Sequence, residues 1–420
     1  MNVNMPLIHK WIKKRKEQKL YEMKPIGSAI RLKRKSMNMT LEEGAEGICS
    51  ISYLSKIENN MIELSDQFMD QLMERFQMKP QPETNDELYQ HHLRLLIKSM
   101  IHGETPSLEI LSKYQHREDH QSYLIGFVIY HLTNKTELRN RCFDQLKIFI
   151  PNMSHHELAL TLVVLGTYFI SVEKYQDAAS ITSMAPEDSL LSIELTMLLK
   201  RIQLIASMRM HRFIDVIDQM NPFMQQAMHL HYYLMMSEVK KEYYGLCAMY
   251  ADPTHMEKTM QAMSSMREDE KDYIKALTYY GSARYQDVLS ITMPYLSSSP
   301  TFMILYLLAL DELGEVTKLI QTIASMPEKI ELTDGLKRVR THLYYKHHPD
   351  RLETLAYLRR EILGIRALPD DYLIIAFLMK DASNLFSKYQ HYKESTQVTF
   401  KFTQHIGALK MAQHRLIPAD

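Results

Sequence analysis

The sequence predicts an all-α protein, and three observations support that fold class. Glycine and proline are scarce, at 12 and 15 of 420 residues, which argues against the many turns of a β-rich fold. Residues that favour helices dominate, among them Leu, Met, Lys and Glu. No stretch shows the period-2 alternation of a half-buried strand. With 45% hydrophobic residues, the chain is long enough to bury a large core in two or more domains.

Charge is distributed unevenly although the net charge is zero. Residues 1–35 contain eleven Lys and Arg against two Glu, a net +9, which leaves −9 on the remainder. A basic front end on an acidic body favours a head that faces nucleic acid and a body with another kind of partner. Residues 1–23 form a basic tail without the apolar run of a secretory signal. We expect this tail to be disordered or weakly helical, or to precede the native start, rather than to serve as a DNA-backbone arm.

Residues 24–78 are predicted to form a small head of short helices. The first helix runs from Ile26 to Met37. The stretch Thr40 to Asn59, TLEEGAEGICSISYLSKIEN, follows as two short helices that are separated at Gly47. Thr40 caps the first of them, and a serine caps the second. A further helix, SDQFMDQLMERF, begins after Ser65.

The second helix of that pair is predicted to carry DNA-reading residues. Ala45, Ile48, Leu54 and Ile57 are spaced to face one small core, so small polar groups and one lysine point outward. A short helix with such side chains on a rigid turn fits the major groove of DNA. The outward residues are Ile51, Ser52, Ser55, Lys56 and Asn59, and Arg31 and Lys33 on the first helix are expected to meet phosphates.

Residues 26–78 resemble the helix-turn-helix of the Xre/Cro repressor family. GICSISYLSKIEN is most similar to the peptide-sensing PlcR and NprR regulators, the RRNPP family of quorum sensing. The resemblance implies that Arg34 and Glu58, at the matching places, form a structural pair inside the head. Leu41 departs from the pattern where a Gln usually contacts a phosphate, and Gly44 departs where a Leu usually packs, so we expect a softer head. The alternative interpretation is a helical hairpin without a role in DNA binding.

Residues 79–87 contain two prolines and read as a linker to a helical repeat domain at residues 88–420. In that domain an aromatic residue recurs after a short turn, at Tyr175, Phe213 and Tyr285, with steps of 38 and 72 residues. The period resembles tetratricopeptide repeats, whose units run ~34 residues. About nine such helix pairs would stack into a superhelix with a concave groove. The segments that share the pattern are 165–186, 204–222, 276–296 and 308–327.

No catalytic or metal-binding motif stands out. There is no Gly-rich phosphate loop, HExxH sequence or nucleophile elbow, so the protein is not predicted to be an enzyme. Adjacent histidines point to different sides of a helix and make poor metal ligands, so neither a metal nor a cofactor is expected. Three scattered cysteines and the missing signal peptide indicate the reducing cytoplasm, and no apolar run reaches transmembrane length.

The resemblance implies a cytoplasmic transcription regulator that binds a double-stranded operator as a homodimer and responds to a short signalling peptide. The repeat pattern predicts that eight residues face the groove and contact the peptide, although packing between repeats is the commoner role of a tyrosine. They are Tyr130, Thr167, Arg201, Tyr273, Tyr280, Asp311, Lys380 and Asn384. Two other classes stay open: a regulator that sequesters or dephosphorylates a response-regulator protein, and a repeat adaptor whose head only dimerises.

Overall fold

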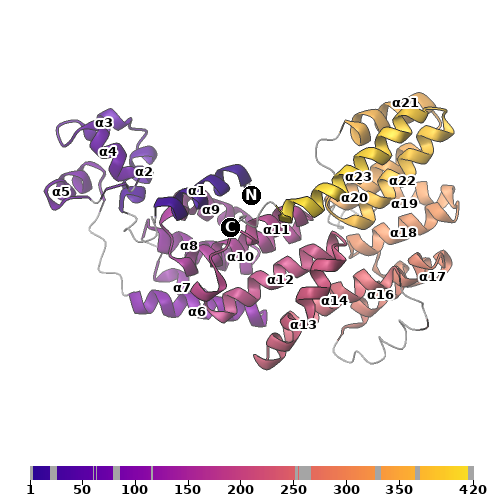
Figure 1. Cartoon of the computed structure of the whole chain (residues 1–420), viewed down its shortest axis with the longest axis horizontal. Coiled ribbons are helices and arrows are strands. Elements are labelled where there is room, and N and C mark those ends of the chain that lie inside the picture. Colours follow the sequence, from indigo (N-terminus) through magenta and orange to yellow (C-terminus); the bar gives the residue numbers. More distant parts are fainter. Residues whose placement is uncertain are drawn as a thin grey trace. The chain divides into compact units, whose positions relative to one another are not determined.

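A computed structural model describes residues 3–18, 26–59, 61–62, 64–78, 86–114, 117–250, 254, 266–326, 333–364 and 369–414. Every regular element in these ranges is a helix, as the sequence predicts (Figure 1). The chain forms two compact units, unit 1 from Met1–Gly166 with Met184–Lys200 and unit 2 from Thr167–Ser183 with Arg201–Asp420. Residues 79–85 of the linker expected at residues 79–87 lie outside the described residues, whereas its last two residues begin α6. The division into domains at that linker stays a prediction.

Unit 1 begins with a helix, a head of four short helices and a helical body. Its elements are α1 (Met5–Gln18), α2 (Ile26–Ser36), α3 (Leu41–Ala45), α4 (Ile51–Glu58), α5 (Asp66–Arg75), α6 (Asp86–His102), α7 (Glu109–Ser112), α8 (His120–Leu132), α9 (Thr136–Leu146), the 3-10 helix η2 (Lys147–Asn152), α10 (His155–Ser171) and the 3-10 helix η3 (Asp188–Leu190). The first head helix thus ends one residue earlier than predicted.

Helix α1 differs from the disordered or weakly helical tail expected for this stretch. Ile8, Ile12 and Arg15 lie on one face of α1 and are buried where α1 packs against η2. The guanidinium of Arg15 donates through Nε and Nη2 to the carbonyl oxygen of Met153, at 3.2 and 2.9 Å. An arginine on the buried face breaks the usual apolar pattern, so the sequence alone did not reveal this amphipathic helix.

A buried carboxylate ties three helices of the body of unit 1 together. Glu157 on α10 accepts a hydrogen bond from the hydroxyl of Tyr89 on α6 at 2.6 Å, and His120 Nε2 on α8 lies 3.3 Å away. The backbone N–H of Ser154 also donates to Glu157 at 2.8 Å. Burial by itself raises the pKa of Glu157, but the contacts with His120, Tyr89 and Ser154 outweigh it and lower the pKa to about 2.

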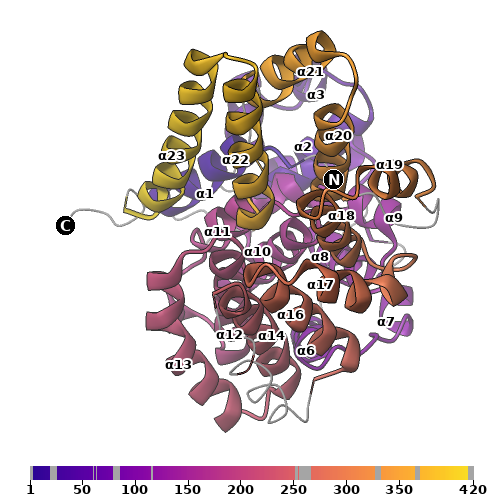
Figure 2. The same cartoon turned by 90° about the vertical axis from the view of Figure 1, so that its right-hand side faces the viewer.

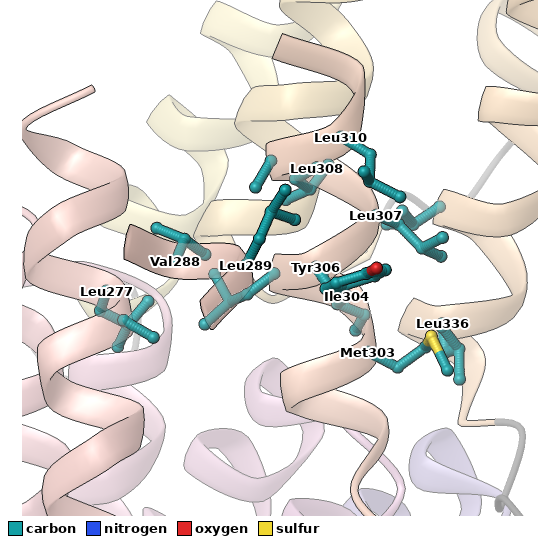
Figure 3. Packing of buried hydrophobic residues seen from close by; sticks show 14 of the residues in the cluster. Leu277, Val288, Leu289, Met303, Ile304, Tyr306, Leu307, Leu308, Leu310 and Leu336 are labelled. Carbon is teal, nitrogen blue, oxygen red and sulfur yellow. The ribbon is translucent and has the colours of Figure 1, made fainter. Parts of the chain in front are cut away.

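Unit 2 is built around α18 (Pro300–Glu312). Every residue from Phe302 to Leu310 is buried, so this helix is apolar all round and lies inside the packed helices (Figure 3). Leu289 and Leu336 lie beside it on two other helices, and Leu277 extends the same buried cluster further from α18 (Figure 3). Helices α10 and α12 (Ile193–Arg209) pass from unit 1 into unit 2, after Gly166 and after Lys200. The other elements of unit 2 are α11 (Tyr175–Thr182), α13 (Phe213–His229), α14 (Tyr233–Ala248), α16 (Glu268–Gly281), α17 (Tyr285–Thr292), the 3-10 helix η4 (Met293–Tyr295), α19 (Val316–Ala324), α20 (Asp334–Lys346), α21 (Arg351–Tyr357), the π-helix η5 (Leu358–Leu363), α22 (Tyr372–Lys388) and α23 (Tyr392–His414).

One backbone turn recurs between helices of the described chain. The turn joins two consecutive helices, and the residue two positions before the second of them has φ between 51° and 71°. The following residue donates its N–H to the carbonyl oxygen of the residue five positions before it, at 2.8 to 3.0 Å. The second helices begin at Tyr175, Phe213 and Tyr285, which are the predicted aromatic places. Their assignment as tetratricopeptide repeats stays a prediction. The residues with positive φ in this turn are Asn134, Glu173, His211, His231, Ala283, Gly314 and Gln390.

Unit 2 also joins segments that are far apart in the sequence. The carboxylate of Glu173 accepts the backbone N–H of Gly335 at 2.7 Å, across 162 residues. The N–H of Gln176 donates to Asp370 Oδ2 at 2.9 Å, across 194 residues. A Cβ at Gly335 would lie 2.3 Å from Cδ1 of Ile374, so a larger residue here would require the end of that side chain to shift. The turn before α11 and the start of α11 therefore contact the N-terminal ends of α20 and α22 (Figure 2).

Candidate nucleic-acid interface

The two short helices α3 and α4 are set by their caps. Thr40 forms a capping box with Glu43, because its hydroxyl accepts the Glu43 N–H at 3.2 Å and the Glu43 carboxylate accepts the Thr40 N–H at 2.6 Å. Ser50 caps α4 by accepting the N–H of Tyr53 at 3.1 Å. Gly47 lies between the helices with φ of +71°, which an L side chain rarely adopts. The predicted turn between two helices is therefore present in this segment.

The core of the head is closed around Gly44. Of the four predicted core residues, Ala45, Leu54 and Ile57 are buried and Ile48 is partly buried. The other buried residues of this core are Ile30, Leu64, Leu72 and Phe76. A Cβ at Gly44 would meet Arg34 Cδ at 2.9 Å, Phe76 Cζ at 3.1 Å and Leu54 Cδ2 at 3.2 Å. The absent side chain therefore leaves no empty space, which argues against the softer head that we expected at this position.

Arg34 and Glu58 lie in direct contact, from α2 and from the end of α4. The Nε atom of Arg34 lies 2.6 Å from Glu58 Oε1, and its Nη2 lies 2.8 Å from Oε2. The third branch of the guanidinium donates to the carbonyl oxygen of Met39 at 2.6 Å. The side chains are only 9% and 3% exposed, and the hydrogen bond to Glu58 raises the pKa of Arg34. This bidentate pair fixes α4 against α2.

The outward side chains of α4 divide into two groups. Ile51, Ser52 and Lys56 are exposed, and 47% of Ile51 is accessible. Ser55 and Asn59 are half-buried, and the amide of Asn59 donates to the Ser55 carbonyl at 2.7 Å. Arg31 Nη1 lies 3.5 Å from the amide oxygen of Asn59 and couples α2 to the end of α4. The first group is therefore free of the packing that restrains Ser55 and Asn59.

Lys33 faces the body of unit 1 rather than the end of α4. Its Nζ lies 3.0 Å from Glu118 Oε2, just before α8. Nearby, the hydroxyl of Ser28 donates to Asn152 Oδ1 at 3.3 Å and joins α2 to η2. Lys33 and Arg31, which we expected to share one role at phosphates, thus point to different neighbours.

The eight residues expected to line the groove differ in how far their side chains are exposed and paired. Arg201 is buried and pairs with Glu238 at 2.8 Å. Asp311 accepts Lys346 Nζ at 2.7 Å and lies 2.8 Å from His347 Nε2. Sequence reasoning missed these partners, because each lies 35 to 37 residues away in a different helix. Lys380 and Asn384 are exposed on α22, and Tyr130, Thr167, Tyr273 and Tyr280 are half-buried.

Residues 30–81 match the family model described as helix-turn-helix, of the Xre type. The matched segment begins in α2, includes α3 to α5 and ends beyond them, so the head is a helix-turn-helix domain of DNA-binding type. No curated protein and no solved structure matches the chain. The match thus concerns the head alone, and any function of the helical body has to be inferred from the residues of that body.

The rest of the described chain adds three findings. No described helix is long and apolar enough to cross a membrane. Within the described ranges, no group of three His, Cys, Asp or Glu side chains could hold a metal ion. Cys49, Cys142 and Cys247 are free thiols, and burial raises the pKa of each of them.

Proposed function

We propose that the protein is a sequence-specific transcription regulator whose affinity for its operator is controlled by a short peptide. The observation that carries the proposal is α4, which presents Ile51, Ser52 and Lys56 to solvent while Arg34 and Glu58 hold its other side. A helix exposed and fixed in this way inside a helix-turn-helix domain is suited to the major groove of DNA.

The exposed residues of α4 have matching partners on base edges. Lys56 donates to the acceptors of a guanine, Ser52 contacts a base or a phosphate, and the side chain of Ile51 packs on a thymine methyl. Arg31 reaches a phosphate beside the end of α4, where Asn59 orients it. One such helix reads only a few base pairs, so we propose that two copies bind two half-sites as a homodimer.

The helical repeats are the proposed site of a peptide of roughly five to ten residues. Helical repeats stack into extended concave surfaces that suit such ligands. On α22 the exposed Asn384 offers a donor and an acceptor for a peptide backbone, and the exposed Lys380 offers a cation for a carboxylate. A peptide that prefers one shape of the repeats changes operator affinity by the ratio of its affinities for the two shapes.

Selection of operators from random duplexes by the full chain tests DNA reading. Lys56→Ala should relax specificity at one base pair at a cost of about 1–3 kcal/mol, because it removes a base contact. Lys113→Ala, which removes an exposed lysine of the body of unit 1, is the matched control and should leave the selected sequence unchanged. If both variants select the parental sequence with parental affinity, α4 is not the reading helix.

Peptide control and dimerisation need separate measurements. The selected operator should bind two chains by light scattering, and a monomer on DNA contradicts the dimer. A random heptapeptide library passed over the immobilised chain should yield retained peptides that change operator affinity. If no peptide is retained while operator binding persists, the repeats have a protein partner instead, and sequestration of a protein replaces peptide control.

A further inference from the structure

Unit 1 contains a cleft of about 360 Å³ that none of the roles above uses. One wall is α6, and the other walls are the first turns of α10 and α12. A volume of this size is typical of sites for small organic ligands. Leu93 and Ile97 on α6 are buried and give the cleft an apolar side, and Leu95 adds an exposed apolar side chain.

The polar side of the cleft is mainly cationic. Arg94 and Lys98 line it one helical turn apart, and neither has an ion-pair partner among the described residues. His91 stands one turn before Arg94, and His156 faces the cleft from α10. Like charges four residues apart on a helix repel each other. Glu194 is the one carboxylate among the lining residues, so it cannot neutralise both permanent cations.

Two helix N-termini also face the cleft, and each has a carboxylate in its first turn. Helices α10 and α12 are each 17 residues long, and their first turns line the cleft through His156 and through Ser192 and Glu194. The free N–H groups and the macrodipole of a helix favour an anion at its N-terminus. Glu194 in the first turn of α12 and Glu157 in the first turn of α10 partly offset these two helices, so the positive charge of the cleft comes mainly from Arg94 and Lys98.

We infer that this cleft binds a small amphipathic anion, a carboxylate or phosphate monoester on a short apolar chain. Arg94 and Lys98 hold the anionic group, and His91 and His156 add donors at its edges. The apolar chain lies along Leu93 and Ile97. This site lies outside the eight groove residues assigned to the peptide, so it is a second ligand site of the protein.

Displacement of the fluorescent anion 1-anilinonaphthalene-8-sulfonate from the full chain tests the site. Octanoate and octyl phosphate should displace the probe, and the stronger of the two identifies the preferred anionic group. Octanol and octylamine have the same apolar chain without the negative charge and should displace little. The variant Arg94→Gln/Lys98→Gln should weaken octanoate by about tenfold for each cation removed, equivalent to ~1.4 kcal/mol each.

The control variant Lys135→Gln/Arg141→Gln removes two exposed cations from the same unit outside the cleft. It should keep the parental displacement by octanoate, with circular dichroism showing that both variants remain helical. The inference is overturned if octanol displaces the probe as well as octanoate does, or if both double variants lose octanoate binding equally. Retention of parental octanoate binding by Arg94→Gln/Lys98→Gln would also overturn it.

Discussion

Two clusters of charge, one in the head and one in unit 2, hold helices together in different ways. In the head, Arg34 meets Glu58 through two hydrogen bonds across 24 residues. In unit 2, Lys346 on α20 lies 2.7 Å from Asp311 on α18 and 2.6 Å from Asp381 on α22. His347 and His342 give those two carboxylates a further donor each, at 2.8 Å. The ion pair Arg34–Glu58 thus joins two helices of the head, whereas in unit 2 a network of five charged or polar side chains joins three helices.

The largest expected effect comes from breaking the head pair. Glu58→Ala should destabilise the head by about 3–5 kcal/mol, because it leaves the guanidinium of Arg34 buried without its counter-ion. Hydrogen exchange of the α2 and α4 amides in the full chain measures this locally. Glu74→Ala, an exposed glutamate of the same head, should change exchange little. Equal protection of α4 in both variants would show that the pair is dispensable.

The buried carboxylate of Glu157 in unit 1 also joins helices, but its partners include no Lys or Arg, and its stabilising effect should depend on pH. Glu157 has a pKa of about 2 in the folded chain against an ordinary 4.5. Its stabilisation is therefore fully present above pH 4.5 and is lost as the pH falls from 4.5 towards 2, by about 3 kcal/mol in total. Urea unfolding between pH 6 and pH 3 measures it. Glu157→Gln should flatten the acid side of that profile, and an unchanged profile would contradict the assignment.

The network of unit 2 should tolerate the loss of its lysine better than the head tolerates the loss of Glu58. Lys346→Met should cost about 2 kcal/mol, because His347 and His342 still serve the two carboxylates. Lys388→Met, at an exposed lysine of α22, is the control. The unfolding transition of unit 2 in urea measures both variants. A cost above that of Glu58→Ala would reverse the comparison.

The head was largely predictable because its signals are local. Caps, a glycine turn and the spacing of Ala45, Leu54 and Ile57 all lie within twenty residues, and they specify α3 and α4. The softer head expected at Gly44 was inferred from the absence of a packing side chain at this position. The structure fills that place with the stem of Arg34 and the ring of Phe76.

The structure of the other regions depends on contacts between residues far apart in the sequence, which local patterns do not predict. Arg15 of α1 finds its acceptor 138 residues away, and the partner of Lys33 lies 85 residues away. In unit 2 the aromatic places gave the starts of α11, α13 and α17, because each follows the same turn. The repeat pattern did not predict that Arg201 and Asp311 form ion pairs with residues of other helices.

The smallest expected effect compares one turn in each region, at a glycine with the same φ. Gly47 in the head and Gly314 in unit 2 both have φ of +71°, and a Cβ at either position would have no neighbouring atom within 4 Å. Ala283, in the same turn of unit 2, has φ of 57°. Alanine at either glycine should cost about 1 kcal/mol through backbone strain alone, and Ala283→Gly should gain up to about 1 kcal/mol. Thermal unfolding of the three variants measures this. The left-handed penalty should be equal in head and repeats, because no side-chain contact enters it. Unequal costs at Gly47 and Gly314 would mean that the tightly packed head resists the strain differently from the repeated turn.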